Sequence, residues 1–227
     1  MTASRLLLVG HGRMGRLVES LAPEFGFTVV GTVDEYTDPK AVWPEADVAI
    51  DFSIAEAVPA TVAALAQRGT PIVIGTTGWQ AAEAQVRISA NGIGVVAAPN
   101  FAVGVNVFLA VTARLGQLMA AQPSFGAWIH EAHHAAKKDA PSGTALAMER
   151  RLRDAGYTGA LSVASTRAGM IPGTHTLGFD NASETITLTH QARDRGAFAR
   201  GSLLAARWVI GKRGWFSMAD VLNLEAK

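Results

Sequence analysis

Residues 6–15 read LLLVGHGRMG, and this stretch decides the fold of the first part of the chain. Leu6 to Val9 is a short apolar run that stops at a glycine, which is typical of a strand buried on both faces of a sheet. From Met14 to about Phe25 the apolar residues recur with the spacing of a helix. The stretch therefore predicts a strand, a tight turn and a helix in direct succession.

The same alternation continues as far as Ala97. Short apolar or β-branched runs predict further strands over Thr28–Val33, Val48–Phe52, Pro71–Ile74 and Ile93–Ala97. The stretches between them predict helices over Ala55–Gln67 and Gln80–Ser89. Strands that alternate with helices form parallel sheets with helices on both faces, so we expect a doubly wound, Rossmann-like α/β domain over residues 1–102.

The alternation of predicted strands and helices ends after Pro99. A long apolar segment, Val105–Met119, is followed by several strand-like stretches that lie close together in the chain. These stretches are Phe125–Glu131, Leu161–Thr166, Thr174–Phe179 and Glu184–Gln191. We therefore expect a second, α+β domain over residues 103–227 with a mostly antiparallel sheet. The helical stretch Gly201–Ile210 is a candidate to return to the first domain.

Composition and charge narrow the classes of function. The 227 residues carry a net charge of +1 and no run of like charges, which gives no field that would favour nucleic acid or a membrane surface as a partner. No apolar run approaches the roughly 18 residues of a membrane span, and the apolar run in Met1–Val9 is too short for an export signal. The absence of cysteine excludes disulfides and fits a reducing compartment. We expect a globular, cytoplasmic protein.

The glycines of residues 10–15 predict a dinucleotide site. Gly10, Gly12 and Gly15 fit the pattern G-x-G-x-x-G, placed after a strand and at the start of a helix, where a pyrophosphate can approach the backbone and the helix N-terminus. Asp34 lies 19 residues after Gly15, at the end of the second predicted strand, where an acid binds the ribose hydroxyls. The alternative is a glycine-rich turn without a ligand, but the strand, the helix and the acid together favour dinucleotide binding.

The residues around this motif bear on the choice of cofactor. The carboxylate of Asp34 repels a ribose 2′-phosphate, and the nearest following base is Lys40, so these residues favour NADH over NADPH. Arg13 is a candidate contact to a phosphate or to adenine, although a solvated arginine in the first turn of a helix is the more common case.

Residues 130–134 read HEAHH and satisfy the zinc-protease motif H-E-x-x-H. That motif works only on a helix, where residues four apart are roughly 6 Å from each other. On a strand the same residues are about 13 Å apart and cannot share one metal ion. The preceding Pro123–Ile129 contains Pro, Gly and alternating large residues, which favours a strand, and so we expect no metal site.

Residues 131–145 read EAHHAAKKDAPSGTA and form the most informative stretch of the chain. Its histidines and lysines supply proton donors and positive charge near one point. Ser142 is suited to cap a helix, whose first amides, those of Gly143 and Thr144, then form a carboxylate site. The alternative is that the histidines are core residues and the lysines solvated, which any one of them alone would favour. Together they indicate a site for a dicarboxylate.

This stretch resembles the signature E-x-H-H-x-x-K-x-D-A-P-S-G-T-A of the dihydrodipicolinate reductase family of lysine and diaminopimelate biosynthesis. Shorter matches span nearly the whole chain, at residues 51–53, 75–78, 98–101, 104–106, 167–169 and 173–175. The resemblance implies an oxidoreductase that reduces 4-hydroxy-tetrahydrodipicolinate to tetrahydrodipicolinate with NADH or NADPH. It also implies a homotetramer, with the second domain serving substrate binding and oligomerisation.

The resemblance assigns roles residue by residue. It implies that His133 is the acid/base histidine, that Lys137 is the proton donor, and that His134, Gly143 and Thr144 contact the substrate carboxylate. Asp139 is expected to orient this loop. The cofactor-binding residues that the motif and the resemblance imply are Gly10, Gly12, Arg13, Met14, Gly15, Asp34, Gly75, Thr76, Thr77, Ala98, Pro99, Asn100 and Phe101.

Two other functions stay open at this point. An amino-acid dehydrogenase on the same scaffold, acting on an open-chain substrate such as aspartate, would bind the same cofactor, but the run from His133 to Thr144 disfavours it. A non-catalytic nucleotide sensor would keep the glycine loop and lose the acid/base groups, whereas His133 and Lys137 are both present. The Rossmann-like domain itself does not separate these functions.

Overall fold

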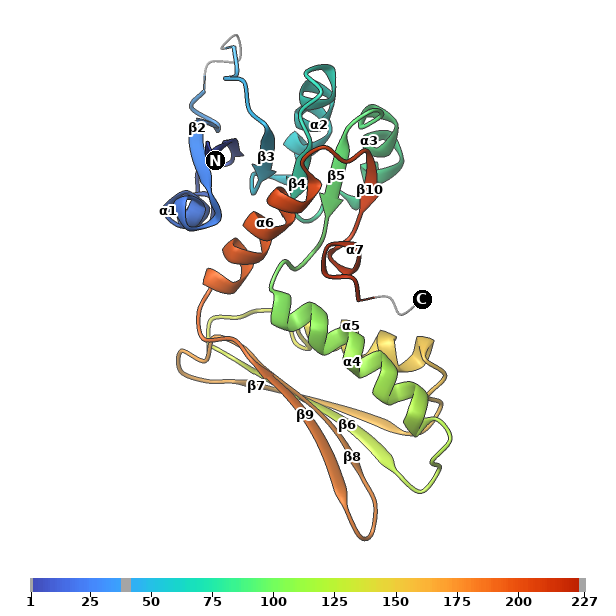
Figure 1. The fold of residues 1–227 in the computed structure, drawn as a ribbon. Helices are drawn as coiled ribbons and strands as arrows, with labels where there is room; N and C mark the ends of the chain where they lie inside the picture. The colour runs from blue at the N-terminus through green and yellow to red at the C-terminus, as the bar shows by residue number, and fades with distance from the viewer. Residues whose placement is uncertain (1, 38–41, 225–227) are drawn as a thin grey trace. The chain divides into compact units, whose positions relative to one another are not determined.

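The computed structural model describes residues 2–37 and 42–224, which form two compact units (Figure 1). One unit joins the residues up to Ala102 with the segment that begins at Gly196, and the other comprises Val103–Arg195. The second domain was expected to cover residues 103–227, but the second unit ends at Arg195. Not only the helical stretch near the end but the whole described segment after Arg195 groups with the first unit.

The first unit contains a six-stranded parallel sheet in the order β10-β5-β4-β3-β1-β2. Its strands are β1 (Ser4–Val9), β2 (Phe27–Val33), β3 (Val48–Asp51), β4 (Ile72–Ile74), β5 (Gly94–Ala97) and β10 (Gly214–Phe216). Because β1 lies between β2 and β3, the chain reverses its direction of winding there, which confirms the doubly wound fold.

Helices cover both faces of this sheet. They are α1 (Arg13–Leu21), α2 (Val58–Gln67), α3 (Glu83–Ser89), α6 (Gly196–Val209) and α7 (Met218–Leu222), with 3₁₀ turns at Ala22–Phe25, Ala55–Ala57 and Gln80–Ala82. Successive residues of a strand point to opposite faces, so Leu6 and Leu8 join the cluster under α1 and α6, whereas Leu7 joins the cluster under α2 and α3. This two-sided burial is why residues 6–9 are uniformly apolar.

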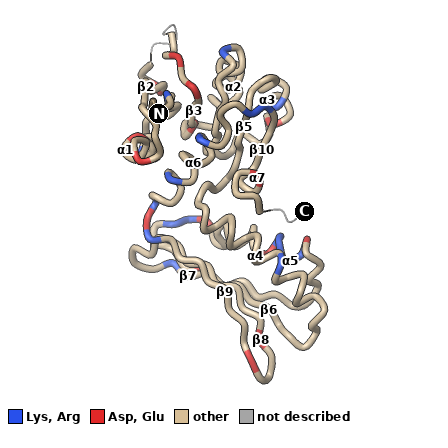
Figure 2. The backbone as a smooth tube through the Cα atoms, viewed as in Figure 1, with Lys and Arg blue, Asp and Glu red and all other residues tan. Residues whose placement is uncertain are grey.

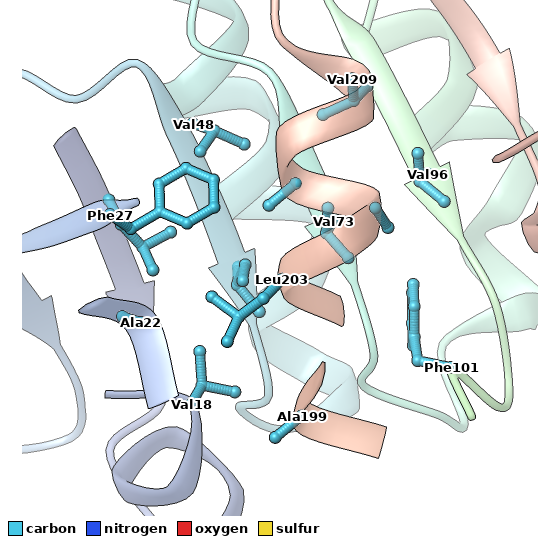
Figure 3. Close-up of a cluster of buried hydrophobic side chains, with 14 of the residues drawn as sticks. Val18, Ala22, Phe27, Val48, Val73, Val96, Phe101, Ala199, Leu203 and Val209 are labelled. Carbon is cyan, nitrogen blue, oxygen red and sulfur yellow. The ribbon is translucent and has the colours of Figure 1, made fainter. Parts of the chain in front are cut away.

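Helix α6 is fixed to the first unit by close packing. Leu203 is fully buried beside Val18 of α1 in the cluster shown in Figure 3, a burial that contributes about 1.5–3 kcal/mol. Gly201 lies so close to the backbone of Phe101 that a Cβ atom there would be 1.7 Å from its carbonyl oxygen. The return of α6 therefore depends on a glycine as well as on apolar side chains.

The second unit is a four-stranded sheet with two helices. The strands are β6 (Gly126–His133), β7 (Leu161–Arg167), β8 (Thr174–Asp180) and β9 (Thr185–Gln191), in the order β7-β6-β8-β9. The β6–β8 and β8–β9 pairs are antiparallel, as expected, but β6 and β7 are parallel. A parallel pair needs a crossover connection, and α5 (Gly143–Asp154) supplies it.

Helices α4 (Val103–Met119) and α5 lie on one side of this sheet (Figure 1). Their apolar residues pack against Ile129 of β6 and Leu177 of β8. The alternation along β6 then points Glu131 and His133 toward the helices and leaves His130 exposed on the other face. The fold thus places charged side chains of β6 in a largely apolar layer.

Charged residues of both signs are spread over each unit (Figure 2). Within residues 2–37 and 42–224, no helix is both long and apolar enough to cross a membrane.

Candidate active site

The glycine loop after β1 combines two packed glycines with an open one. Gly10 has a φ of +84°, and a Cβ atom there would lie 2.5 Å from the carbonyl oxygen of Phe52. A Cβ atom at Gly15 would lie 2.2 Å from the carbonyl oxygen of Gly10. By contrast, nothing lies within 4 Å of a Cβ atom built at Gly12. Two glycines therefore close the turn, and the third leaves space for a group that approaches the backbone.

Helix α1 starts at this open position. Gly12 is its N-cap residue, with no side-chain cap and no acidic residue in the first turn, so the first amides are available to an anion. A pocket of about 340 Å³ lies here. It is lined by Gly12, Arg13, Met14, Phe52, Ser53, Ile54, Ala55, Gly75, Thr76 and Thr77. The residues present fit a pyrophosphate, and six of the expected cofactor residues line this one pocket.

Asp51, at the end of β3, holds two loops of this pocket together. Its Oδ1 atom accepts hydrogen bonds from Ser53 N (2.8 Å), Ser53 Oγ (2.6 Å) and Thr76 Oγ1 (2.8 Å). Burial raises the pKa of Asp51 although these hydrogen bonds act in the opposite direction. Its Oδ2 is buried without a hydrogen-bond partner among the described residues. Asp51 thus couples the loops after β3 and β4.

Asp34 lies directly after β2, as predicted, and beside the glycine loop. Gly10 N donates to the carbonyl oxygen of Val33 at 2.7 Å. The carboxylate oxygen Oδ1 of Asp34 accepts from Tyr36 N (3.0 Å) and Thr37 Oγ1 (3.1 Å), which folds the following turn around the side chain. Lys40 lies outside the described residues.

The remaining expected cofactor residues follow β5. Ala98 and Pro99 line a second pocket of the first unit, of about 460 Å³, together with Thr76. Phe101 is 2% exposed and packs edge-on against Phe52 at a centroid distance of 6.4 Å, so its side chain belongs to the core. Asn100 turns the chain there, because its Oδ1 accepts from Ala102 N at 2.9 Å. Phe101 therefore belongs to the core, and the side chain of Asn100 shapes the turn after β5.

In the second unit, the H-E-x-x-H residues lie on and just after a strand. His130 is on the exposed face, where its Nε2 pairs with Thr166 Oγ1 at 2.9 Å. His134 follows the last residue of β6. The extended conformation that was expected here is confirmed, and His130 and His134 do not converge on a common point.

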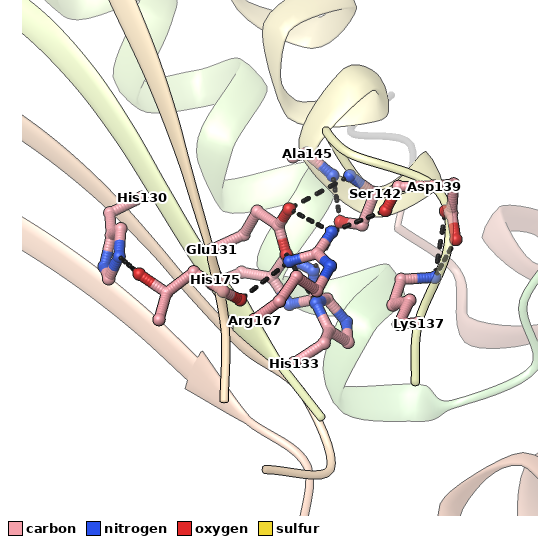
Figure 4. A network of polar contacts seen from close by, with 10 residues as sticks. His130, Glu131, His133, Lys137, Asp139, Ser142, Ala145, Arg167 and His175 are labelled. Carbon is pink, nitrogen blue, oxygen red and sulfur yellow. Dashed lines mark hydrogen bonds and ion pairs between the residues drawn. The ribbon is translucent and has the colours of Figure 1, made fainter. Parts of the chain in front are cut away.

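Glu131 is the centre of a buried polar cluster (Figure 4). Arg167 binds both of its carboxylate oxygens, through Nη2 to Oε1 at 2.7 Å and Nη1 to Oε2 at 3.0 Å. Ser142 N donates to Oε1 at 3.2 Å, and Nδ1 of His133 bonds Oε2. The β6–β7 register produces this cluster, because it places Arg167 opposite His133.

The pKa values of Glu131, His133 and His175 define the charges in this cluster. Burial by itself raises the pKa of Glu131, but hydrogen bonds from Arg167, Ser165 and His133 outweigh it and bring that pKa to about 2. Burial lowers the pKa of His133 despite its contact with Glu131. Burial, with the neighbouring His133, lowers the pKa of His175 to about 4. Glu131 is therefore ionised and His175 neutral at physiological pH.

Helix α5 begins beside this cluster. Ser142 is its N-cap residue, and its Oγ accepts from Ala145 N at 3.3 Å, as expected. The same Oγ pairs with Nε2 of His175 at 3.1 Å. The amides of Gly143 and Thr144 are first-turn donors that the helix itself cannot satisfy. They are suited to bind a carboxylate.

Lys137 lies on the loop between β6 and α5. Its Nζ binds both carboxylate oxygens of Asp139, at 2.7 and 2.9 Å, and Arg167 Nη2 bonds the carbonyl oxygen of Asp139. The loop also turns tightly, since Lys137 N donates to the carbonyl oxygen of His134 at 3.0 Å. Asp139 therefore links Lys137 to the Arg167 cluster.

Comparisons with known proteins agree over nearly the whole chain. Residues 4–101 match the family described as "Dihydrodipicolinate reductase, N-terminus", and residues 104–222 match "Dihydrodipicolinate reductase, C-terminus". The chain belongs to the dihydrodipicolinate reductase family. It is 42% identical to the 4-hydroxy-tetrahydrodipicolinate reductase of Acidiphilium cryptum, over 94% of each chain. It is 43% identical to that of Gluconobacter oxydans, over 98% of each chain.

A solved structure shares the fold of this family member. It is the dipicolinate-bound dihydrodipicolinate reductase of Paenisporosarcina sp. TG-14, with a TM-score of 0.75 and 21% sequence identity. The match covers 96% of this chain and 98% of that chain. At this identity it supports the fold alone, including the combination of a parallel and a mixed sheet.

Three residues of the cluster had no expected role. Glu131 was part of the family signature, and Arg167 and His175 stood in shorter matches, but their contacts depend on strand pairing. The register sets Glu131 opposite His175 on β8 and His133 opposite Arg167 on β7. The signal available in the sequence was a charged residue within an otherwise apolar strand face.

The ligand atoms of Glu131, His133 and His175 lie within 4.8 Å of one another, a spacing that could surround a metal ion. The guanidinium of Arg167, however, already binds both oxygens of Glu131. A metal cation would have to displace that positive charge or lie against it. We therefore interpret Glu131, His133 and His175 as part of a hydrogen-bond network.

Proposed function

We propose that this chain reduces 4-hydroxy-tetrahydrodipicolinate to tetrahydrodipicolinate with NADH or NADPH, a step of lysine and diaminopimelate biosynthesis. The observation that carries the proposal is the loop from His133 to Thr144, which gathers an acid/base histidine, a lysine and the start of a helix. Full-length relatives named as this reductase support it. The aspartate-type dehydrogenase finds no comparable support in this loop.

The first unit holds the cofactor. The first amides of α1, with Gly12, Arg13 and Met14, bind the pyrophosphate, and Asp34 binds the ribose hydroxyls of the adenosine part. Gly75, Thr76 and Thr77, at the end of β4, and the backbone of Ala98–Phe101 bind toward the nicotinamide. The bound cofactor supplies the hydride. Asp51 contributes by fixing Thr76.

The second unit holds the substrate. The amides of Gly143 and Thr144 bind a carboxylate of the cyclic dicarboxylate, and His134 adds a donor to the same group. Loss of the substrate hydroxyl as water needs a proton on the departing oxygen, and Lys137 donates it from its ammonium group. His133 acts as the acid/base group beside it. Asp139 holds Lys137 in place until substrate binds.

We further propose that the protein works in the cytoplasm as a homotetramer, as its family membership suggests. The face of the four-stranded sheet opposite α4 and α5 is free to serve as the subunit interface. It carries small polar side chains, including Thr176 of β8 and Thr187 of β9, around Trp128 of β6.

The test is the rate of NADH and NADPH oxidation with 4-hydroxy-tetrahydrodipicolinate generated enzymatically in the cuvette. We expect rapid oxidation that depends on this substrate, and tetrahydrodipicolinate as the product. In a parallel reaction oxaloacetate and ammonia replace the substrate, because an aspartate-type dehydrogenase would oxidise the cofactor there. Oxidation only in that second reaction would overturn the proposal, and oxidation in neither would favour a nucleotide sensor.

A further inference from the structure

Hydrogen-bond donors surround both carboxylate oxygens of Glu131. Each oxygen serves two donors: Oε1 accepts from Arg167 Nη2 and Ser142 N, and Oε2 accepts from Arg167 Nη1 and His133 Nδ1. The Glu131 side chain is fully buried, so protein donors take the place of water around its carboxylate. Each of these donors therefore needs an acceptor at Glu131.

This demand determines which nitrogen of His133 carries the proton. An ionised carboxylate can only accept, so His133 must donate from Nδ1–H. Arg167 remains charged at all relevant pH values and holds Glu131 in the ionised form. A neutral His133 therefore has its lone pair on Nε2, and only Nε2 can exchange a proton with a ligand.

The surroundings of Nε2 are kept clear. Gly173 has a φ of +141°, and a Cβ atom there would lie 3.1 Å from His133 Nε2, tighter than an ordinary contact. The ring of His175 meets that of His133 edge-on, at a centroid distance of 5.1 Å. The charged and titratable groups that act on His133 are Glu131, Lys137, Arg167 and His175. Of these, Glu131 alone is anionic.

We propose that Glu131 is a positioning residue, which fixes the tautomer of His133 with the proton on Nδ1 and directs Nε2 to the substrate. Arg167 completes the arrangement by holding Glu131 ionised and oriented. The inference rests on the proposed role of His133 in the reduction. It adds to that role a residue that touches neither substrate nor cofactor.

The substitution Glu131→Gln tests this because it exchanges one acceptor for a donor at nearly constant shape. Oε1 faces two donors that cannot become acceptors, Arg167 Nη2 and Ser142 N, whereas Oε2 faces one such donor, Arg167 Nη1, and His133. The glutamine oxygen therefore takes the Oε1 position and the amide nitrogen the Oε2 position. There it faces His133 Nδ1, which must then accept a hydrogen bond. The proton of neutral His133 consequently moves to Nε2.

The tautomer itself can be measured by ¹⁵N NMR of the labelled histidines, with His133 assigned by comparison with His133→Asn. We expect protonated Nδ1 in the wild type and protonated Nε2 in Glu131→Gln. Protonated Nε2 in the wild type would overturn the inference, whether or not any variant folds. This readout is independent of turnover, so it also separates the inference from the proposed function.

Kinetics give the second readout. We expect kcat of Glu131→Gln to fall by about 10²–10⁴-fold, the range that acid/base catalysis contributes, with NADH affinity unchanged. Loss of the anionic neighbour lowers the pKa of His133, so the limb of the pH–rate profile that His133 controls shifts to lower pH. The matched control is Glu184→Gln, in the exposed turn between β8 and β9, which should behave like the wild type. A folded Glu131→Gln with wild-type kcat and pH profile would contradict the proposal.

Discussion

The bidentate pair of Glu131 and Arg167 is the dominant buried charge of the second unit. The carboxylate is fully buried and the Arg167 side chain is 17% exposed, so neither group is well solvated. Removing one partner of such a pair is strongly destabilising, because the other charge is left uncompensated. We infer that this arrangement serves to orient His133, since an apolar pair would pack at lower cost.

We propose that Asp34 sets the preference for NADH over NADPH. Replacing it by alanine removes the charge that repels a ribose 2′-phosphate and the acceptor for the ribose hydroxyls. We expect Asp34→Ala to lower the ratio of kcat/KM for NADH to that for NADPH by about 10-fold or more, equivalent to about 1.4 kcal/mol. Steady-state kinetics with both cofactors measure this ratio. Asp47→Ala is the control, because Asp47 lies just before β3, at the opposite ends of the parallel strands from Asp34. An unchanged ratio in Asp34→Ala would remove Asp34 from the site.

The sequence predicted the residues whose chemistry is local. Gly10, Gly12 and Gly15 follow a strand, and Ser142 precedes a helix, so their surroundings could be inferred from a few neighbouring residues. The contacts of Glu131 could not be inferred in this way. Its partner Arg167 is 36 residues away and meets it only because β7 pairs with β6 in parallel.

At the scale of elements, α5 connects the stability of the second unit with its binding site. Ser142 caps the helix, bonds His175 and presents its amide to Glu131. Its hydroxyl therefore orders the helix start that supplies the amides of Gly143 and Thr144. A change in this one side chain should affect both folding and substrate binding.

We expect Ser142→Ala to lower the free energy of unfolding by about 1 kcal/mol, as the loss of an N-cap does, and to raise KM for the substrate. NADH affinity should not change, because the cofactor residues lie in the other unit. Urea denaturation and steady-state kinetics measure the two effects. Ser217→Ala removes the N-cap of α7 in the first unit and should cost similar stability without changing that KM. A KM for Ser142→Ala equal to that of the wild type would separate α5 from substrate binding.

Strands and helices could be predicted where the apolar residues are strongly periodic, as in residues 6–25. The pairing of the strands within a sheet could not be predicted. The mostly antiparallel second sheet contains the parallel pair β6–β7. That pair arises because α5 packs on the sheet and carries the chain back to the same end. Packing of this kind involves Met148 and Leu152 on one helix face, which local patterns do not relate to a particular strand.

At the scale of the whole molecule, the chain leaves the first unit at Ala102 and returns to it at Gly196. The sequence indicated a helix near the end but not the unit to which it belongs. That choice depends on Leu203 filling the core beside Val18 and on Gly201 fitting against Phe101, contacts between residues about half the chain or more apart. Because the first unit is built from an N-terminal and a C-terminal segment, the second unit is a continuous insertion between them.

The proposed tetramer makes a prediction for the sheet face opposite α4 and α5. Thr176 lies on central strand β8, half-buried within one protomer, and arginine there would place a charge in the middle of the interface. We expect Thr176→Arg to elute as a smaller species by size-exclusion chromatography with light scattering. Thr158→Arg, in the exposed loop after α5, should stay tetrameric. A folded Thr176→Arg that remains a tetramer would place the interface elsewhere.

The proposed role of Lys137 is to donate the proton in the reduction of the cyclic substrate. Its most direct test compares initial rates of NADH oxidation for the wild type, Lys137→Ala and the exposed neighbour Lys138→Ala, with NADH binding measured for each. We predict rapid oxidation by the wild type and Lys138→Ala, and a kcat lower by about 10²–10⁴-fold for Lys137→Ala with NADH binding unchanged. Equal turnover of the two lysine variants, or loss of NADH binding together with turnover in Lys137→Ala, would contradict it.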